Sequence, residues 1–317
     1  MSLEPAKRAV PIGRRTMLGG VIGAGITLIT AGCNLPVGQS FGISRSPLRF
    51  LSGQIAATMK LLEPIGTETI RQLDVLRSHH QKHLDALRHR TRTDPPNPTW
   101  PSLPTDPKKR VAAAERALAE LAGKLCLRIP DIGNRVDAAR QDDFVALLGS
   151  IAACQRVHQW LVSGTGVSDS QDWSMGGRGR DALPVLQSAL DGEHAAIYGY
   201  GALGGRLGKS DRSSALTAQE VHRDRRDALA ESITVRGGQP HASEARYELP
   251  IAVTDPNSAR QLAARLEDDC AGQWRQALST VQPGDRDPAL RALTHCAVTA
   301  AKWRPGSAAA NPAFPGV

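Results

Sequence analysis

The segment LDGEHAAIYGY, residues 190–200, carries a pattern that predicts a helix. Apolar residues in and before it recur three, four or seven residues apart, which places them on one face: Leu183, Leu186, Leu190, Ile197 and Tyr200. Glu193 falls on that same face. A carboxylate in an apolar stripe is costly to bury unless it is paired, protonated or bound to a metal. The question that the sequence poses is therefore what Glu193 faces.

The composition favours helices throughout the 317 residues. Tyrosine and phenylalanine are scarce, with three and four residues, whereas strands are rich in aromatic and β-branched side chains. We therefore expect an all-α protein of closely packed helices. The net charge of +8 indicates a mildly basic surface. Because basic residues are not clustered with base-stacking aromatics, we do not expect nucleic acid as a partner.

The chain contains an internal duplication. Four motifs of the first half recur in the same order in the second, with nearly the same offset. The matching segments are 51–59 with 190–198, 80–87 with 222–229, 105–107 with 254–256, and 116–119 with 260–263. One match has little weight, but four in order indicate two related halves.

Each half is predicted to form four helices. The expected ranges are 47–62, 68–90, 107–128 and 142–161, then 182–207, 213–236, 256–279 and 288–303. Thr-Asp-Pro before the third helix of each half supplies an Asp cap and a proline at the first helical position. The connection between the second and third helices is long in both halves, as in ferritin-like bundles. We predict two tandem ferritin-like four-helix bundles, at 47–162 and 182–304, joined by a linker at 163–181 and followed by a disordered tail at 305–317.

Residues 1–33 have the features of an export signal. Arg14 and Arg15 form a twin-arginine pattern, followed by a short, glycine-rich, weakly apolar run. The run ends at Thr30-Ala-Gly-Cys33, which resembles a bacterial lipobox although Thr30 departs from the usual leucine. We predict lipidation at Cys33, with residues 34–46 as a tether. An ordinary cleaved signal and an uncleaved anchor are the alternatives.

The other four cysteines lie on the third and fourth predicted helices of each half. An even number of cysteines outside the cytoplasm favours disulfides. Equivalent placement in the two halves favours the pairs Cys126–Cys154 and Cys270–Cys296. Buried free thiols are the alternative.

The second half resembles an uncharacterised ferritin-like family of actinobacterial exported proteins. The residues that carry the resemblance are EHAAIYGY at 193–200, His222 with RRDAL at 225–229, Tyr247-x-Leu249-Pro250, and Ala263-x-x-Leu266-Glu267. The first half resembles this family only through the duplication.

The ferritin-like resemblance implies a test for metal ligands. Such sites take a Glu from each of two helices and a Glu-x-x-His from each of the others. Four residues match in type and place, namely Glu193, His222, Glu267 and His295, while Gln219 and Ala292 stand where two further carboxylates are expected. The four could hold one Fe, Mn or Zn ion, though no cofactor is certain. The alternative is a structural Glu–His network, or Glu193 hydrogen-bonded to Tyr198 or an arginine.

The first half retains less of this pattern. Gln54, Gly123 and Ala153 replace the equivalents of Glu193, Glu267 and His295, and only His80 persists. We therefore interpret the first bundle as structural. The histidines of its second helix, His79, His80, His83 and His89, are interpreted as a solvated polar face, with a metal site as the less favoured reading.

The sequence thus predicts an exported, lipid-anchored protein on the outer face of the cell membrane. The missing ligands favour a non-catalytic binding or structural role, and no catalytic residue is assigned. The alternative is a metal-binding protein or metal-dependent oxidoreductase that uses the second bundle. Besides the membrane, a cell-envelope protein and a second copy of the chain stay open as partners.

Overall fold

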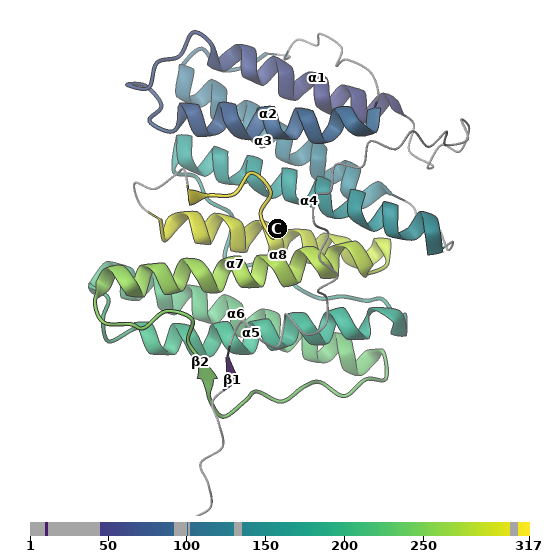
Figure 1. Ribbon diagram of the computed structural model, residues 1–317, viewed down its shortest axis with the longest axis vertical. Coiled ribbons are helices and arrows are strands. Elements are labelled where there is room, and N and C mark those ends of the chain that lie inside the picture. Colours follow the sequence, from purple (N-terminus) through teal and green to yellow (C-terminus); the bar gives the residue numbers. More distant parts are fainter. Residues whose placement is uncertain (1–9, 12–44, 92–99, 101, 130–134, 305–309) are drawn as a thin grey trace, which may run out of the picture.

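The computed structural model describes residues 10–11, 45–91, 100, 102–129, 135–304 and 310–317. The described residues are mostly helical, with eight α-helices and one pair of two-residue strands (Figure 1). The predicted signal, Cys33 and nearly all of the predicted tether lie outside these ranges. Among the described helices, none is both long enough and apolar enough to cross a membrane.

The first four helices form the N-terminal half of the structure. They are α1 (Arg45–Leu62), α2 (Leu73–Thr91), α3 (Pro107–Arg128) and α4 (Arg135–Ser163). The predicted starts differ most at α4, which begins seven residues early, and at α2, which begins five residues late. A series of tight turns over residues 62–73, with bonds such as Ile65 N–H to Leu62 O, replaces its expected first turn.

The last four helices form the C-terminal half. They are α5 (Leu183–Leu203), α6 (Lys209–Val235), α7 (Pro256–Thr280) and α8 (Arg286–Lys302). Short 3₁₀ turns at Arg180–Ala182 and Pro283–Asp285 precede α5 and α8. The strands β1 (Val10–Pro11) and β2 (Tyr247–Glu248) pair in parallel beside this half.

Both Thr-Asp-Pro motifs start helices, as the sequence predicts. The Asp106 carboxylate accepts a hydrogen bond from the Lys109 backbone N–H at 2.8 Å, at the start of α3. The Asp255 carboxylate accepts from the backbone N–H groups of Asn257 and Ser258, and the Ser258 hydroxyl completes a capping box at α7. These bonds satisfy N–H groups that the first turn of a helix leaves without partners.

The two halves share one hydrophobic core. In Figure 1 the helices of the N-terminal half lie above those of the C-terminal half, with α4 next to α7 and α8. Leu148 and Ile151 of α4 belong to the same buried cluster as Leu278 of α7 and Leu293 of α8. A Cβ atom on Gly149 would lie 2.4 Å from Leu278 Cδ2, so this glycine allows α4 to approach α7 closely.

Two segments outside the predicted bundles contribute to the packing. Trp173 and Met175, in the predicted linker, are buried in the shared core. At the C-terminus, residues 310–317 pack between the halves, where the sequence predicted a disordered tail. The Ala313 carbonyl accepts a hydrogen bond from His83 Nε2 at 2.7 Å, and the Pro315 carbonyl accepts one from the Ser150 hydroxyl at 2.8 Å. These two bonds attach the chain end to the N-terminal half.

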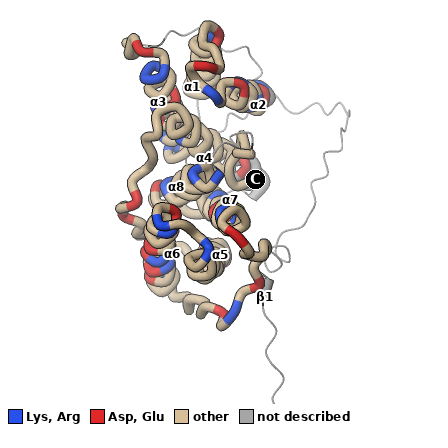
Figure 2. The backbone as a smooth tube through the Cα atoms, turned by 90° about the vertical axis from the view of Figure 1, so that its left-hand side faces the viewer, with Lys and Arg blue, Asp and Glu red and all other residues tan. Residues whose placement is uncertain are grey.

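Charges of both signs are mixed on the outside of the helices. Figure 2 shows Lys and Arg interspersed with Asp and Glu along α6. Ion pairs on this helix join Arg223 to Glu220 and Arg226 to Asp227. Exposed pairs of this kind add little stability. The charged groups that matter more are those enclosed by the helices.

Candidate functional site: two buried polar centres

A set of charged side chains lies inside the C-terminal half. We call Glu193 of α5, His222 and Arg225 of α6, and Glu267 of α7 the C-terminal centre. All four side chains are completely buried. Their helices present them inward because each residue continues the apolar face of its own helix, as the sequence indicated for Glu193.

His222 bridges the two carboxylates. Its Nδ1 lies 2.5 Å from Glu193 Oε2, and its Nε2 lies 3.3 Å from Glu267 Oε1. Burial by itself lowers the pKa of His222, but the two adjacent carboxylates outweigh it and raise this pKa to about 10. Since a carboxylate can only accept, both ring nitrogens donate and His222 is an imidazolium.

The carboxylates respond in the opposite direction. Burial by itself would raise the pKa of Glu267, but His222 and Arg225 lower it to about 2. The pKa of Glu193 is also lowered, because Arg225 and His222 outweigh its burial. Trp274 Nε1 donates to Glu193 at 2.5 Å, and the Tyr200 hydroxyl donates to Glu267 at 2.7 Å. Both acids are therefore ionised and hydrogen-bonded.

Arg225 supplies the second positive charge. Its Nη1 lies 3.4 Å from Glu193 Oε1 and 2.9 Å from Cys296 Sγ, and its guanidinium stacks 4.9 Å from the centroid of the Trp173 ring. With His222 it balances Glu193 and Glu267, two positive charges against two negative. The sequence analysis offered an arginine as a partner of Glu193 but did not identify Arg225 as that residue. The signal was its position, three residues after His222, where it shares the inner face of α6.

His295 does not join the other three predicted ligands. Its Nδ1 accepts a hydrogen bond from Arg225 Nη2 at 2.8 Å, and its Nε2 pairs with Asp169 Oδ1 of the linker at 3.0 Å. Glu193, His222 and Glu267 are brought together, while the Arg225 guanidinium lies between Glu193 and His295. Tyr198, the other suggested partner of Glu193, packs on Tyr247 instead.

A second polar cluster lies inside the N-terminal half. We call His79 and His80 of α2, Glu115 of α3, and Cys154 and His158 of α4 the N-terminal centre. All five are buried, as is the nearby His83. The predicted solvated face at His79, His80 and His83 is therefore wrong. The side chain of His89 lies outside the described set.

The apolar pattern of α2 explains this burial. Leu73, Leu76, His80, His83 and Leu87 follow one another at spacings of three and four, and all five are buried. His80 and His83 thus occupy core positions of a stripe that leucines define. The interpretation from sequence considered the spacing of the histidines to one another and not their register with these leucines.

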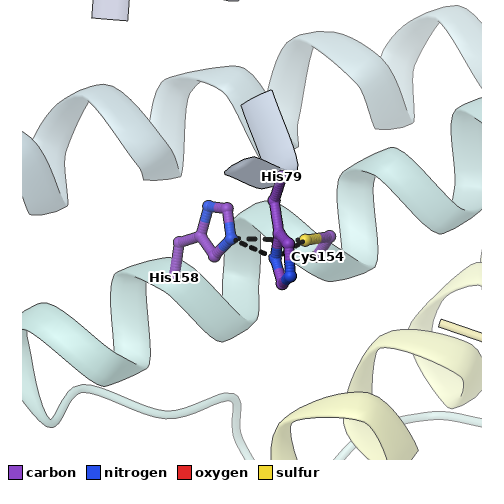
Figure 3. Close-up of side chains that lie close together, drawn as sticks. All are labelled: His79, Cys154 and His158. Atoms are coloured by element: carbon purple, nitrogen blue, oxygen red, sulfur yellow. Dashed lines mark hydrogen bonds between the residues drawn. The ribbon is translucent and has the colours of Figure 1, made fainter. Parts of the chain in front are cut away.

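Three potential ligand atoms converge in the N-terminal centre (Figure 3). His79 Nδ1 lies 3.0 Å from His158 Nε2, and Cys154 Sγ lies 3.4 Å from each of these nitrogens. On the other side of its ring, His158 Nδ1 lies 3.3 Å from Glu115 Oε2. Glu115 Oε1 accepts from His80 Nε2 at 2.8 Å.

Protonation differs between the two centres. Burial lowers the pKa of His79 to about 3 and also lowers the pKa of His158, so both rings are neutral at pH 7. Burial by itself raises the pKa of Glu115, but His80 and His158 lower it to about 2. Burial raises the pKa of the Cys154 thiol well above its usual value. His79 and His158 are therefore neutral imidazoles, whereas His222 carries two protons.

Glu115 and His158 were missed from the sequence. The duplication aligned Gly123 with Glu267, but the acid of the N-terminal half is eight residues earlier, about two helical turns away. The centre therefore lies at a different level of its helices, and matching positions between the halves did not find it. His80 is still the one residue retained at an equivalent position, and Glu115 and His158 join it from other positions.

The predicted disulfides are absent from the described cysteines. Cys126, Cys154, Cys270 and Cys296 are all free and buried. Cys126 Sγ–H donates to Val145 O at 3.5 Å, and Cys154 lies nine residues further along α4, about 13 Å away at the helical rise. Cys270 and Cys296 lie within hydrogen-bonding reach of one another but are not joined. Helix packing, rather than equivalent numbering, determines which thiols are neighbours.

An open groove lies where α3, α4 and α8 meet the linker. It has a volume of about 530 Å³. Its lining includes Lys124, Arg156 and Arg291 together with Glu120 and Asp287. This mixture of charges selects for neither a cation nor an anion.

The fold and the two centres define an all-helical protein with buried charged and metal-ligating side chains. Among known families, residues 185–317 match the one described as "Domain of unknown function (DUF4439)". The C-terminal half thus carries a DUF4439 domain, and the C-terminal centre lies within it. The N-terminal centre lies outside the matched segment.

One solved structure gives a more particular likeness. The chain is similar to the crystal structure of "a conserved hypothetical protein, rv2844, from Mycobacterium tuberculosis", with 34% sequence identity and a TM-score of 0.39. The match covers 41% of this chain and 98% of the other. No curated protein matches the chain.

Proposed function

We propose that the protein is an exported, lipid-anchored member of the ferritin-like class with a non-catalytic, binding or structural role outside the cell membrane. In this proposal the two halves are tandem bundles related by duplication, and the C-terminal half has given up the metal centre of its class. The observation that carries the proposal is the charge balance at the C-terminal centre.

The balance leaves no free ligand atom on His222. A metal ligand must offer a lone pair, and both ring nitrogens of His222 donate to carboxylates. Arg225 supplies a fixed positive charge beside Glu193, and a guanidinium does not lose its proton in proteins. A metal ion would therefore have to displace one proton and repel one arginine. Glu193, His222 and Cys270 are close enough to share an ion, but the bound protons and Arg225 oppose it.

Such a network suits a structural role. A buried pair that keeps both partners is tolerated, whereas removal of one partner costs several kcal/mol because a charge is left alone. The network therefore favours one arrangement of α5, α6 and α7. The alternative function, a metal-dependent oxidoreductase at this centre, requires His222 to lose a proton that two carboxylates hold.

The first experiment measures metal in export-matured protein that has not been refolded. The comparison is between the wild type and the Glu193→Gln/Glu267→Gln double variant. We expect the same transition-metal content in both. A loss of one ion per chain in the double variant would overturn the proposal.

A second readout examines the proton directly. Nitrogen NMR of His222 at pH 7 should find both ring nitrogens protonated, because the pKa lies near 10. A bare ring nitrogen would count against the network.

The anchoring part of the proposal rests on the lipobox-like sequence before Cys33. The expected location is the membrane fraction, with exposure to protease added outside the cell. Cys33→Ala should release the protein from the membrane without changing its fold. Retention of this variant in the membrane fraction would show that the lipid is not the anchor.

A further inference from the structure

We propose that the N-terminal centre is a binding site for one zinc-type divalent transition-metal ion, held by His79 Nδ1, His158 Nε2 and Cys154 Sγ. This site lies in the N-terminal half, for which the proposed function names no ligand. It uses none of the residues of the C-terminal centre.

The distances between the three atoms fit one ion. Zinc binds imidazole nitrogen at about 2.0–2.1 Å and thiolate sulfur at about 2.3 Å in a tetrahedron, which places neighbouring ligand atoms about 3.3 Å (N to N) and 3.6 Å (N to S) apart. The observed separations are 3.0 Å between the nitrogens and 3.4 Å from Sγ to each nitrogen. Shifts of a few tenths of an ångström would complete the arrangement.

The tautomer of His158 directs a lone pair at this point. His158 Nδ1 faces Glu115 Oε2, which can only accept, so Nδ1 carries the proton of the neutral ring. Its Nε2 then offers a lone pair toward His79 and Cys154. A carboxylate behind a ligating histidine is the usual support of a metal-bound imidazole, because it fixes the ring and makes it more basic. Glu115 is therefore a positioning residue and not a ligand.

The charges of the loaded site also balance. On binding, a coordinate bond forms between Cys154 Sγ and the ion, the S–H bond breaks, and its proton passes to solvent. The thiolate and the Glu115 carboxylate then carry two negative charges against the two positive charges of the ion. Burial raises the pKa of the Cys154 thiol, so the free site holds a neutral thiol and the ion must displace its proton.

The donor set indicates the class of metal. One thiolate with two imidazoles suits zinc and copper better than the oxygen-preferring magnesium, calcium or manganese ions. Three protein ligands leave the fourth tetrahedral position for water or another external ligand. In the C-terminal centre, by contrast, the histidine has both nitrogens occupied.

The test uses the full chain, freed of metal with a chelator and then titrated with Co²⁺ as a spectroscopic substitute for zinc. We expect one ion per chain, a thiolate-to-cobalt charge-transfer band in the near ultraviolet, and displacement of the cobalt by one equivalent of Zn²⁺. Cobalt binding without the thiolate band, or no binding, would overturn the proposal.

Variants locate the site. Cys154→Ala should abolish the charge-transfer band, while Cys126→Ala, which removes an equally buried thiol of the same half, should retain it. Glu115→Gln should weaken zinc binding roughly 10- to 100-fold, as loss of a supporting carboxylate does. Equal binding by the two cysteine variants would overturn the assignment.

A measurement on the wild type covers the case in which Cys154→Ala fails to fold. Zinc-edge X-ray absorption of the loaded protein should show one sulfur and two imidazole nitrogens around the ion. A shell of nitrogen and oxygen alone would refute the site. Glu193→Gln/Glu267→Gln should leave all these signals unchanged, so failure here is distinguishable from failure of the proposed function.

Discussion

Replacement of Arg225 by methionine tests the buried charge network most directly. Methionine retains much of the length and apolar bulk of arginine but removes the positive charge. Three charges then remain, Glu193 and Glu267 against the His222 imidazolium, so one carboxylate has no counter-charge. Breaking a fully buried pair in this way costs about 3–5 kcal/mol. Because Arg225 is completely buried, solvent screening does not reduce this figure.

The assay is urea unfolding followed by circular dichroism and by tryptophan fluorescence, since Trp274 donates to Glu193 and reports on the centre. The matched control is Arg226→Met, at the next residue of α6. Its arginine pairs with the exposed Asp227, and such a pair is worth less than about 1 kcal/mol. Equal, small losses for the two variants would refute the charge-network reasoning.

A double variant separates charge from packing. In Arg225→Met/Glu193→Gln, His222 and Glu267 remain as one balanced pair. We expect this variant to be more stable than the sum of the single changes predicts, by about 0.5–3 kcal/mol. Strict additivity would mean that Arg225 acts through its contacts with Trp173 and Cys296 and not through charge.

Further predictions concern pH, the chain end and a helix cap. The pKa of His222 is about 10 in the folded protein, above the ordinary 6.5, so its contribution to stability is complete below pH 6.5 and is lost as pH rises to about 10. His222→Gln should remove this slope from the free energy of unfolding as a function of pH. In metal-free protein the pKa of His79 is about 3 in the folded state, so stability is lost as pH falls from 6.5 toward 3, and His79→Asn should remove that slope. An unchanged slope in either variant would contradict the pKa assigned to that histidine. Deletion of residues 312–317 removes the carbonyl partners of His83 and Ser150 and should lower the free energy of unfolding in urea by at least about 2 kcal/mol. Deletion of the exposed Val317 alone should have little effect. Equal effects of the two deletions would refute the stabilising role of this segment. Asp106→Ala should lower the free energy of unfolding by about 1 kcal/mol through the loss of the cap of α3. The control is Lys109→Ala, which keeps the capped backbone N–H. A loss no larger than that of the control would mean that the cap does not stabilise the helix.

The helices were predictable because their signals are local. The predicted ranges 107–128 and 256–279 agree with α3 (Pro107–Arg128) and α7 (Pro256–Thr280) to within one residue, since an Asp cap and a proline define each start. Glu193 was recognised as buried from the periodicity around it. Its neighbour in the apolar stripe, Leu190, is buried as expected.

Two of the predictions that failed depend on contacts between distant residues. The pair Cys126–Cys154 was inferred from equivalent positions, but pairing requires two thiols at the same level of adjacent helices, and Cys126 contacts Val145 instead. The packed chain end at residues 310–317 was also unpredictable, because its partners, His83 and Ser150, are more than 160 residues away in the chain.

The sequence by itself determined an all-α fold, the starts of α3 and α7 and the burial of Glu193, because periodicity and caps act within a few residues. Tertiary structure alone decided what Glu193 faces. Packing of α5, α6 and α7 brings His222 and Arg225 to it, and two positive charges then neutralise two carboxylates where the sequence left a metal site open. The same packing places His79, Cys154 and His158 together in the half interpreted as structural. Protonation and ligand geometry depend on neighbours in space, and spacing along the chain does not specify those neighbours.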